Sequence, residues 1–358
     1  MLEPYNNRNL LYLNELKNNL FDNFLNNKLH HSLLFVGEKG VGKATLCYHL
    51  ANKILDYKTT LKSNEPLSLF GEPEDEGDTL SEKNPTFNLI INKKHSDLLV
   101  IEKETDEKTN KIDKEIKVSS ARKINNFVSL SPFIAKNKVI IVDSIDEMNT
   151  SAQNAILKIL EEPIKNTYIF LVCHNIDNVL ETIKSRCREV KVNKYNFQQW
   201  KDILTYVCND KIKLLNENQL SILYDLSNSS ISTAIDIIDE DGIFLYNNIG
   251  NILSASILNI EEIHNLADKI NNNDKLFNLF YKFILLFLYK TLRYYSTGQS
   301  NNNFKELNNN FLLKNNEKSI LDKIKFTKNI FNDINTYNLN KKHAIIVLFD
   351  NIFNIVKI

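Results

Sequence analysis

The sequence predicts an α/β fold with a parallel sheet up to about residue 193 and an all-helical remainder. Short apolar runs that suit buried strands stand in the first part, helical spacing of apolar residues separates them, and the strand signals end near residue 193. Apolar strands that are joined through helices indicate a parallel sheet that is covered by helices on both faces. The expected strands are residues 32–36, 98–101, 139–142, 168–172 and 190–192.

Helices are expected between these strands and throughout the second half. Residues 43–55 carry apolar side chains at helical spacing, and Ser151 is suited to cap a helix that stops at Pro163. Residues 58–88 are polar, acidic and rich in proline, which predicts a partly disordered surface excursion. The other expected helices are residues 120–130, 180–187, 197–209, 217–226, 231–238, 261–272, 274–296, 317–334 and 340–357.

The composition is that of a globular chain. Of 358 residues, 43% are hydrophobic and 25% charged, which suits about two or three domains. The 44 basic and 44 acidic residues leave no net charge, which argues against tight, independent nucleic-acid binding. The four cysteines form no CxxC pair, which argues against a thiolate zinc site and a disulfide framework and suits a reducing cytosol. The most apolar segment, residues 283–288, is too short to cross a membrane.

A glycine-rich segment follows the first strand and opens the first helix. Residues 37–45 read GEKGVGKAT, which has the spacing and context of a Walker A phosphate loop. Gly37, Gly40 and Gly42 let the backbone curl so that its N–H groups face phosphate oxygens, and Lys43 adds a positive charge. The alternative is a glycine-rich turn between a strand and a helix.

Two residues that ATP hydrolysis needs are replaced. Ala44 stands where Walker A has the Ser or Thr that ligates Mg²⁺, and Thr45 lies about 100° further round the helix. Asp143 ends a strand as in a Walker B motif, where it would hold magnesium through water. Ser144 follows it, instead of the Glu that orients the attacking water in an active ATPase. A second interpretation of Asp143 is that it caps the next turn.

Five segments in this order resemble the delta-prime subunits of bacterial DNA polymerase III clamp loaders, which are AAA+ proteins. These segments are residues 29–46, 95–102, 142–149, 152–163 and 182–188. The GKAT form of the phosphate loop is similar to that of alphaproteobacterial members. The remainder of the chain is similar to the family only in pattern.

The resemblance implies an arginine finger. Residues 185–187 read Ser-Arg-Cys, a motif whose arginine, here Arg186, faces outward and reaches the ATP bound by the neighbouring subunit. A planar guanidinium can fork onto phosphate oxygens and stabilise the charge of phosphoryl transfer. The residues alone leave open that Arg186 pairs with a local carboxylate such as Glu189. Residues 161–163, Glu-Glu-Pro, are implied to shape the subunit interface near this motif.

The sequence also departs from active members of the family. Ser232 occupies the position of a sensor arginine, and residues 56–95 lack the four cysteines of a zinc module, so we expect no zinc. With the Mg²⁺ hydroxyl, the water-orienting Glu and the sensor Arg all missing, little or no ATPase activity is expected. ATP or ADP could still bind without hydrolysis, at Gly37, Gly40, Gly42, Lys43, Ala44, Thr45 and Asp143.

These expectations combine into one hypothesis. Residues 1–192 form an AAA+ P-loop domain, residues 193–242 a helical lid and residues 243–358 a helical C-terminal collar. The chain would be non-catalytic by itself but part of the DNA-directed DNA polymerase (nucleotidyltransferase) holoenzyme in the cytoplasm, assisting ATP-dependent loading of the sliding clamp. Its partners would be gamma/tau-type motor subunits, the delta subunit, the clamp and, through the complex, primed DNA, without a membrane. The alternatives are an ATP-hydrolysing motor subunit of the same loader and a small-molecule P-loop kinase.

Two weaker signals complete the analysis. An aromatic and aliphatic stripe between residues 277 and 289 predicts core packing, with contacts to partner subunits. Lys136, Lys138, Lys191 and Lys194 could form a basic rim, although scattered lysines are usually solvated, so no DNA contact is assigned to them.

Overall fold

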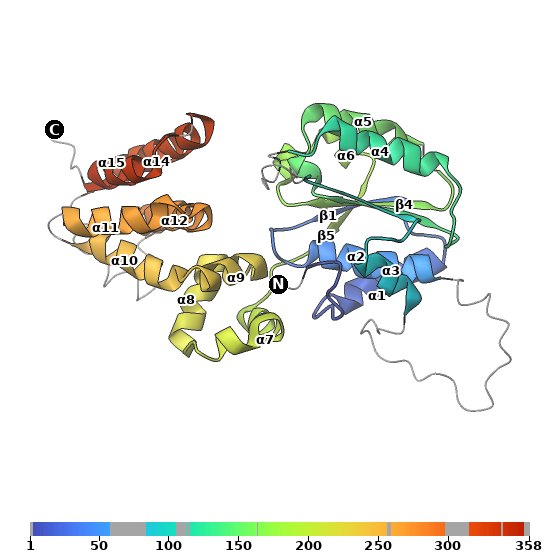
Figure 1. The fold of residues 1–358 in the computed structure, drawn as a ribbon, viewed down its shortest axis with the longest axis horizontal. Helices are drawn as coiled ribbons and strands as arrows, with labels where there is room; N and C mark the ends of the chain where they lie inside the picture. The colour runs from blue at the N-terminus through green and yellow to red at the C-terminus, as the bar shows by residue number, and fades with distance from the viewer. Residues whose placement is uncertain are drawn as a thin grey trace. The chain divides into compact units, whose positions relative to one another are not determined.

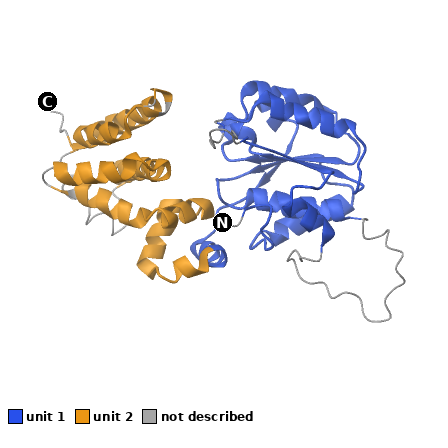
Figure 2. Ribbon diagram, viewed as in Figure 1, with its two compact units in different colours: residues 1–207 blue, residues 208–358 orange. Residues whose placement is uncertain are grey.

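The computed structural model describes residues 3–57, 84–104, 113, 115–162, 164–255, 259–297, 315–337 and 339–353. The chain divides into two compact units, residues 1–207 and 208–358 (Figure 2). The division falls inside helix α7 (Phe197–Ile212), where the backbone of Cys208 leaves the helical conformation with φ −136° and ψ 42°. The finer division at residues 192 and 242 stays a prediction.

Unit 1 is built on a five-stranded sheet in the order β2-β3-β4-β1-β5, and every neighbouring pair is parallel. The expected strands are confirmed to within two residues at each end, because uninterrupted apolar runs suit strands that are buried on both faces. Residues 139–142 of β3, for example, are fully buried. The strands are β1 (Ser32–Val36), β2 (Leu98–Glu102), β3 (Lys138–Asp143), β4 (Thr167–Cys173) and β5 (Arg188–Lys191).

Helices cover both faces of this sheet, as predicted. In Figure 1, α4, α5 and α6 lie on one face, and α1, α2 and α3 on the other. These helices are α1 (Asn14–Leu25), α2 (Lys43–Asp56), α3 (Pro85–Ile91), α4 (Val118–Ser129), α5 (Thr150–Glu161) and α6 (Glu181–Lys184). Single 3₁₀ turns, η2 (Ile145–Glu147) and η3 (Ile176–Asn178), follow β3 and β4.

Some local predictions need correction. The cap of α5 is Asn149, not Ser151: its extended backbone lets the side-chain oxygen accept a hydrogen bond from the N–H of Ala152 at 2.9 Å. Helices α1 and α3 are not among the helices expected from the sequence. The last residues of the predicted surface excursion are helical, because Asn84 caps α3 and Pro85 suits its first turn. Residues 58–83 of that excursion lie outside the described residues.

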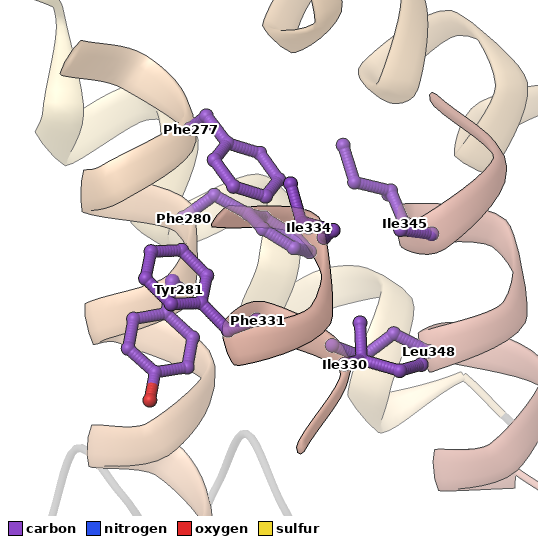
Figure 3. Close-up of a pocket in the computed structure, with 9 residues that line it drawn as sticks. Phe277, Phe280, Tyr281, Ile330, Phe331, Ile334, Ile345 and Leu348 are labelled. Carbon is purple, nitrogen blue, oxygen red and sulfur yellow. The ribbon is translucent and has the colours of Figure 1, made fainter. Parts of the chain in front are cut away.

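The described part of unit 2 consists of helices without strands, as expected. The stripe on α12 is largely core, with Phe280, Phe283 and Ile284 at most 1% exposed, whereas Tyr289 is 43% exposed. Figure 3 shows a small apolar pocket between α12, α14 and α15, in which Phe277 stacks on Phe331. The helices are α8 (Glu217–Ser227), α9 (Ile231–Asp239), α10 (Gly242–Ser254, not anticipated), α11 (Ile260–Asn271), α12 (Asp274–Thr297), α14 (Glu317–Tyr337) and α15 (Lys341–Phe353).

Candidate functional site

The phosphate loop lies at the carboxyl edge of the sheet, between the end of β1 and the start of α2. Gly40 and Gly42 have φ values of 81° and 85°, in the left-handed region that favours glycine. A Cβ on Gly37 would collide with the carbonyl oxygen of Val192, which directly follows β5. The three glycines are therefore required by the backbone path, and the N-terminus of α2 opens onto the loop as expected for a phosphate-binding turn.

The side chain of Lys43 is buried within the loop and binds its backbone. Its Nζ donates to the carbonyl oxygen of Gly37 at 2.7 Å and to that of Glu38, and the residue is only 2% exposed. Burial lowers the pKa of Lys43 to about 8, against the opposing attraction of Asp143. The loop thus keeps a cation in a position where a bound anion would stabilise its charged form.

Asp143 faces this lysine from the end of β3. Its pKa is raised to about 6, chiefly by burial and also by the charges of Glu102 and Glu147, while Lys43 acts in the opposite direction. The next residue, Ser144, is 1% exposed, and its Oγ has no hydrogen-bond partner among the described residues. A carboxylate and a cation therefore meet at this edge, but the position after Asp143 offers only a small buried hydroxyl.

Magnesium does not fit the predicted ligand set. Ala44 has no oxygen, and Thr45 is displaced round the helix from the position that ligates the ion. The backbone N–H groups of the loop and Lys43 fit a phosphate, because neither needs a metal to bind oxygen anions. Among the described residues, no group of three or more His, Cys, Asp or Glu side chains could hold a metal ion. Most of residues 56–95, the segment to which the expectation of no zinc applies, lies outside the described residues.

Asp146 and His174 belong to this site, although the sequence analysis did not assign them to it. The carboxylate of Asp146 accepts hydrogen bonds from the backbone N–H groups of His174 and Asn175, at 2.9 and 3.0 Å. Burial and the nearby positive charge of Lys43 lower the pKa of His174, so its imidazole is neutral at pH 7. A signal was present in the sequence, because His174 is the first polar residue after the apolar run of β4.

Arg186 lies at the opposite, amino edge of the sheet, two residues before β5 begins. Its Nε donates to Oε1 of Glu161 at 2.7 Å, and its Nη2 lies 2.5 Å from the same oxygen. Its Nη1 donates to the carbonyl oxygen of Thr182 at 2.8 Å and to Oγ of Ser185 at 3.2 Å. The local carboxylate is therefore Glu161, not Glu189, because Arg186 follows α6 and turns toward the end of α5.

The expected basic rim of four lysines is not formed in the structure. Lys138 is 3% exposed, and its Nζ donates to the carbonyl oxygens of Phe127 and Leu130 at the end of α4. Lys194 pairs with Glu38 at 2.7 Å. Lys138 begins β3 at the amino edge, whereas Lys191 ends β5 at the carboxyl edge, so the four lysines do not form one patch.

The sequence matches the family described as DNA polymerase III, delta subunit, over residues 12–196, just over half of the chain. The chain belongs to this family. Among its relatives is the delta-prime subunit of DNA polymerase III from Pseudomonas aeruginosa, 31% identical over 157 residues, which cover 44% of this chain and 41% of that protein. The predicted resemblance to delta-prime clamp-loader subunits is thereby confirmed.

Two further relatives span more of the chain. The gamma subunit of DNA polymerase III from Buchnera aphidicola is 24% identical over 233 residues, which cover 65% of this chain and 57% of that subunit. A solved gamma subunit-related protein from Thermotoga maritima covers 95% of this chain and 98% of its own, with 18% identity and a TM-score of 0.43. The chain thus spans about half the length of the Pseudomonas and Buchnera subunits that it matches.

Three remaining features concern other expectations. Ser232, the residue predicted to occupy the sensor-arginine position, lies on α9 in unit 2, and its Oγ is 3.3 Å from that of the helix cap Ser230. No helix in the described ranges is long and apolar enough to cross a membrane. Burial raises the pKa of the Cys187 thiol, next to Arg186 in the sequence, to about 12, which keeps it protonated and unreactive.

Proposed function

We propose that this chain is the delta-prime subunit of a replicative clamp loader, that it has little or no ATPase activity, and that it supplies Arg186 in trans. The observation that carries the proposal is the separation of two groups. Lys43 stands at the carboxyl edge of the sheet and Arg186 at the amino edge. A five-residue strand such as β1 spans about 16 Å, so Arg186 cannot reach a phosphate at its own loop. The resemblance to clamp-loader subunits implies that the target is the nucleotide of an adjacent protomer, and the position of Arg186 is compatible with that role.

The carboxyl edge supports binding without hydrolysis. The glycine backbone and Lys43 would hold the phosphates of ATP or ADP, whereas Ala44 and Ser144 supply neither a magnesium ligand nor a base. Each such loss costs orders of magnitude in rate, and the losses need not add. The chain would then serve as a comparatively rigid, non-catalytic member of the DNA-directed DNA polymerase (nucleotidyltransferase) holoenzyme.

Its partners in this proposal are gamma/tau-type motor subunits, the delta subunit and the sliding clamp. Primed DNA would be met through the complex, and the cytoplasm is the corresponding location. The rival assignment as a motor subunit requires steady ATP turnover by the isolated chain. The rival assignment as a small-molecule P-loop kinase requires phosphoryl transfer to a nucleoside monophosphate. Ala44 and Ser144 argue against the motor subunit, because they replace the Mg²⁺ ligand and the water-orienting Glu of an active ATPase. The kinase would need an arginine-rich lid and an acceptor site, and neither is apparent in the sequence.

The test is a reconstituted loader in which the adjacent motor subunit alone is able to hydrolyse ATP. Replacing Arg186→Ala should lower ATP turnover stimulated by clamp and primed DNA by about 10³-fold, with assembly intact, because an arginine finger contributes at least that factor. Arg188→Ala is the matched control, since Arg188 is exposed two residues away and should leave turnover unchanged. Unchanged turnover with Arg186→Ala would refute the trans role, and brisk hydrolysis by the isolated chain would refute the inactive site.

A further inference from the structure

The guanidinium of Arg186 is held by groups from two helices. Oε1 of Glu161 accepts hydrogen bonds from both Nε and Nη2. Nη1 donates to the Thr182 carbonyl oxygen and to Ser185 Oγ. These contacts engage four of the five N–H donors of a guanidinium. Arg186 is nevertheless 32% exposed, so the group is fixed in orientation while it still faces solvent.

The position of Glu161 favours a role that is not helix stability. It is the last residue of α5, where the helix dipole makes a carboxylate unfavourable. The end of this helix is fixed, because His31 Nε2 donates to the carbonyl oxygen of Leu160 at 3.0 Å. Glu161 is therefore a carboxylate on a rigid support, and its binding partner in the structure is the guanidinium of Arg186.

The two sides of the Arg186 guanidinium bind different kinds of acceptor. The Nη1 side is bound to Thr182 and Ser185, which are local to Arg186 and move with it. The Nε–Nη2 side is bound to a carboxylate oxygen, and a phosphate oxygen is the chemical equivalent of that acceptor for arginine. Exchange of Glu161 for a phosphate would leave the other two contacts in place and would require little motion of the arginine.

We propose that Glu161 is a positioning residue for Arg186. Its carboxylate holds the Nε–Nη2 edge in the orientation from which that edge passes to a phosphate oxygen of the neighbouring protomer's nucleotide. The inference rests on the proposed trans role of Arg186 and deepens it, because it names the group that orients the finger. Loss of this orientation should reduce kcat at the neighbouring site and leave KM for ATP nearly unchanged, since ATP binding itself is the work of the neighbour.

The test uses the same reconstituted loader. Glu161→Ala should lower kcat by about tenfold, because a small misplacement of a catalytic group is sufficient for such a loss. Glu161→Gln should restore most of the rate, since its carbonyl oxygen still accepts from Nε and Nη2. Glu189→Ala is the matched control: it removes the exposed carboxylate that the sequence offered as an alternative partner of Arg186 and should leave kcat unchanged.

A double variant separates positioning from damage to the fold. If Glu161 acts through Arg186, Arg186→Ala with Glu161→Ala should be no slower than Arg186→Ala alone. A further loss in the double variant, or wild-type kcat with Glu161→Ala, would overturn the inference while leaving the finger intact. If Arg186→Ala by itself leaves turnover unchanged, the proposed function fails and the inference fails with it.

Discussion

The two edges of the parallel sheet hold their buried carboxylates differently. At the amino edge, the Asp97 carboxylate accepts hydrogen bonds of 2.7 to 2.8 Å from the backbone N–H groups of residues 133–135. At the carboxyl edge, the pKa of Asp143 is raised to about 6, chiefly by burial. The lysines of the two edges are alike, because Lys138 and Lys43 each donate to two carbonyl oxygens and burial lowers the pKa of both. Backbone N–H partners therefore make Asp97 structural, whereas burial opposes the charge of Asp143.

The largest difference between the edges should appear in stability. Asp97→Ala removes the acceptor of three backbone N–H groups, of which that of Ala135 is buried, and should lower the free energy of unfolding of unit 1 by about 3 kcal/mol. Asp143→Ala removes a carboxylate that burial disfavours and should change it by less than about 1 kcal/mol. Urea denaturation followed by fluorescence reports on unit 1, because Trp200, the one tryptophan, is buried there. Equal losses for the two variants would contradict the comparison.

The second difference is a pH dependence of nucleotide affinity. The pKa of Lys43 in the free loop is about 8, and its charged form binds phosphate, so binding takes up a proton above that pH. Affinity for ATP should fall by about tenfold from pH 7 to pH 9, measured by titration calorimetry. In Lys43→Arg the cation persists above pH 12, so any remaining affinity should be flat across this range. A flat wild-type profile would show that Lys43 does not carry the phosphate contact.

The same pKa gives the sign of a stability effect. The unfolded chain binds more protons than the folded one between about pH 8 and the usual lysine value of 10.5. The contribution of Lys43 to the free energy of unfolding therefore increases with pH across that window. A loop built for stability alone would place a neutral side chain at this position.

The smallest effect concerns the stability contribution of the Arg186–Glu161 pair. Its side chains are 32% and 48% exposed, and exposed pairs contribute about 0–1 kcal/mol. Arg186→Ala should therefore leave the free energy of unfolding within about 1 kcal/mol of the wild type, measured in the same urea experiment. A loss as large as that of Asp97→Ala would show that the pair holds the fold together and would weaken its assignment to function.

Much of the fold could be predicted because apolar runs and glycines report local constraints. The five strands and the loop glycines fall into this class, since burial on both faces and positive φ angles limit the residues that fit. The order of the strands does not, because it depends on contacts between distant segments. The short helix α3 is hard to predict because proline at its first position is also a loop signal.

The sequence predicts which residues make up the candidate site but not which residues bind them. The glycines, Lys43 and Asp143 follow a sequence spacing, and the structure brings them to one edge. The partner of Arg186 is 25 residues away in the sequence, and nothing local to Arg186 indicates it. Lys138 illustrates the converse, because a long basic side chain was expected in solvent and instead closes the end of α4.

The four-residue strand β5 has a consequence for both edges. Val192, at one end, covers Gly37 with its carbonyl oxygen and donates its N–H to Val36, while Arg186 stands just before the other end. Four extended residues measure only about 13 Å. One short extended segment therefore joins the wall of the phosphate loop to the segment that carries Arg186, and a change in the length of β5 would alter both.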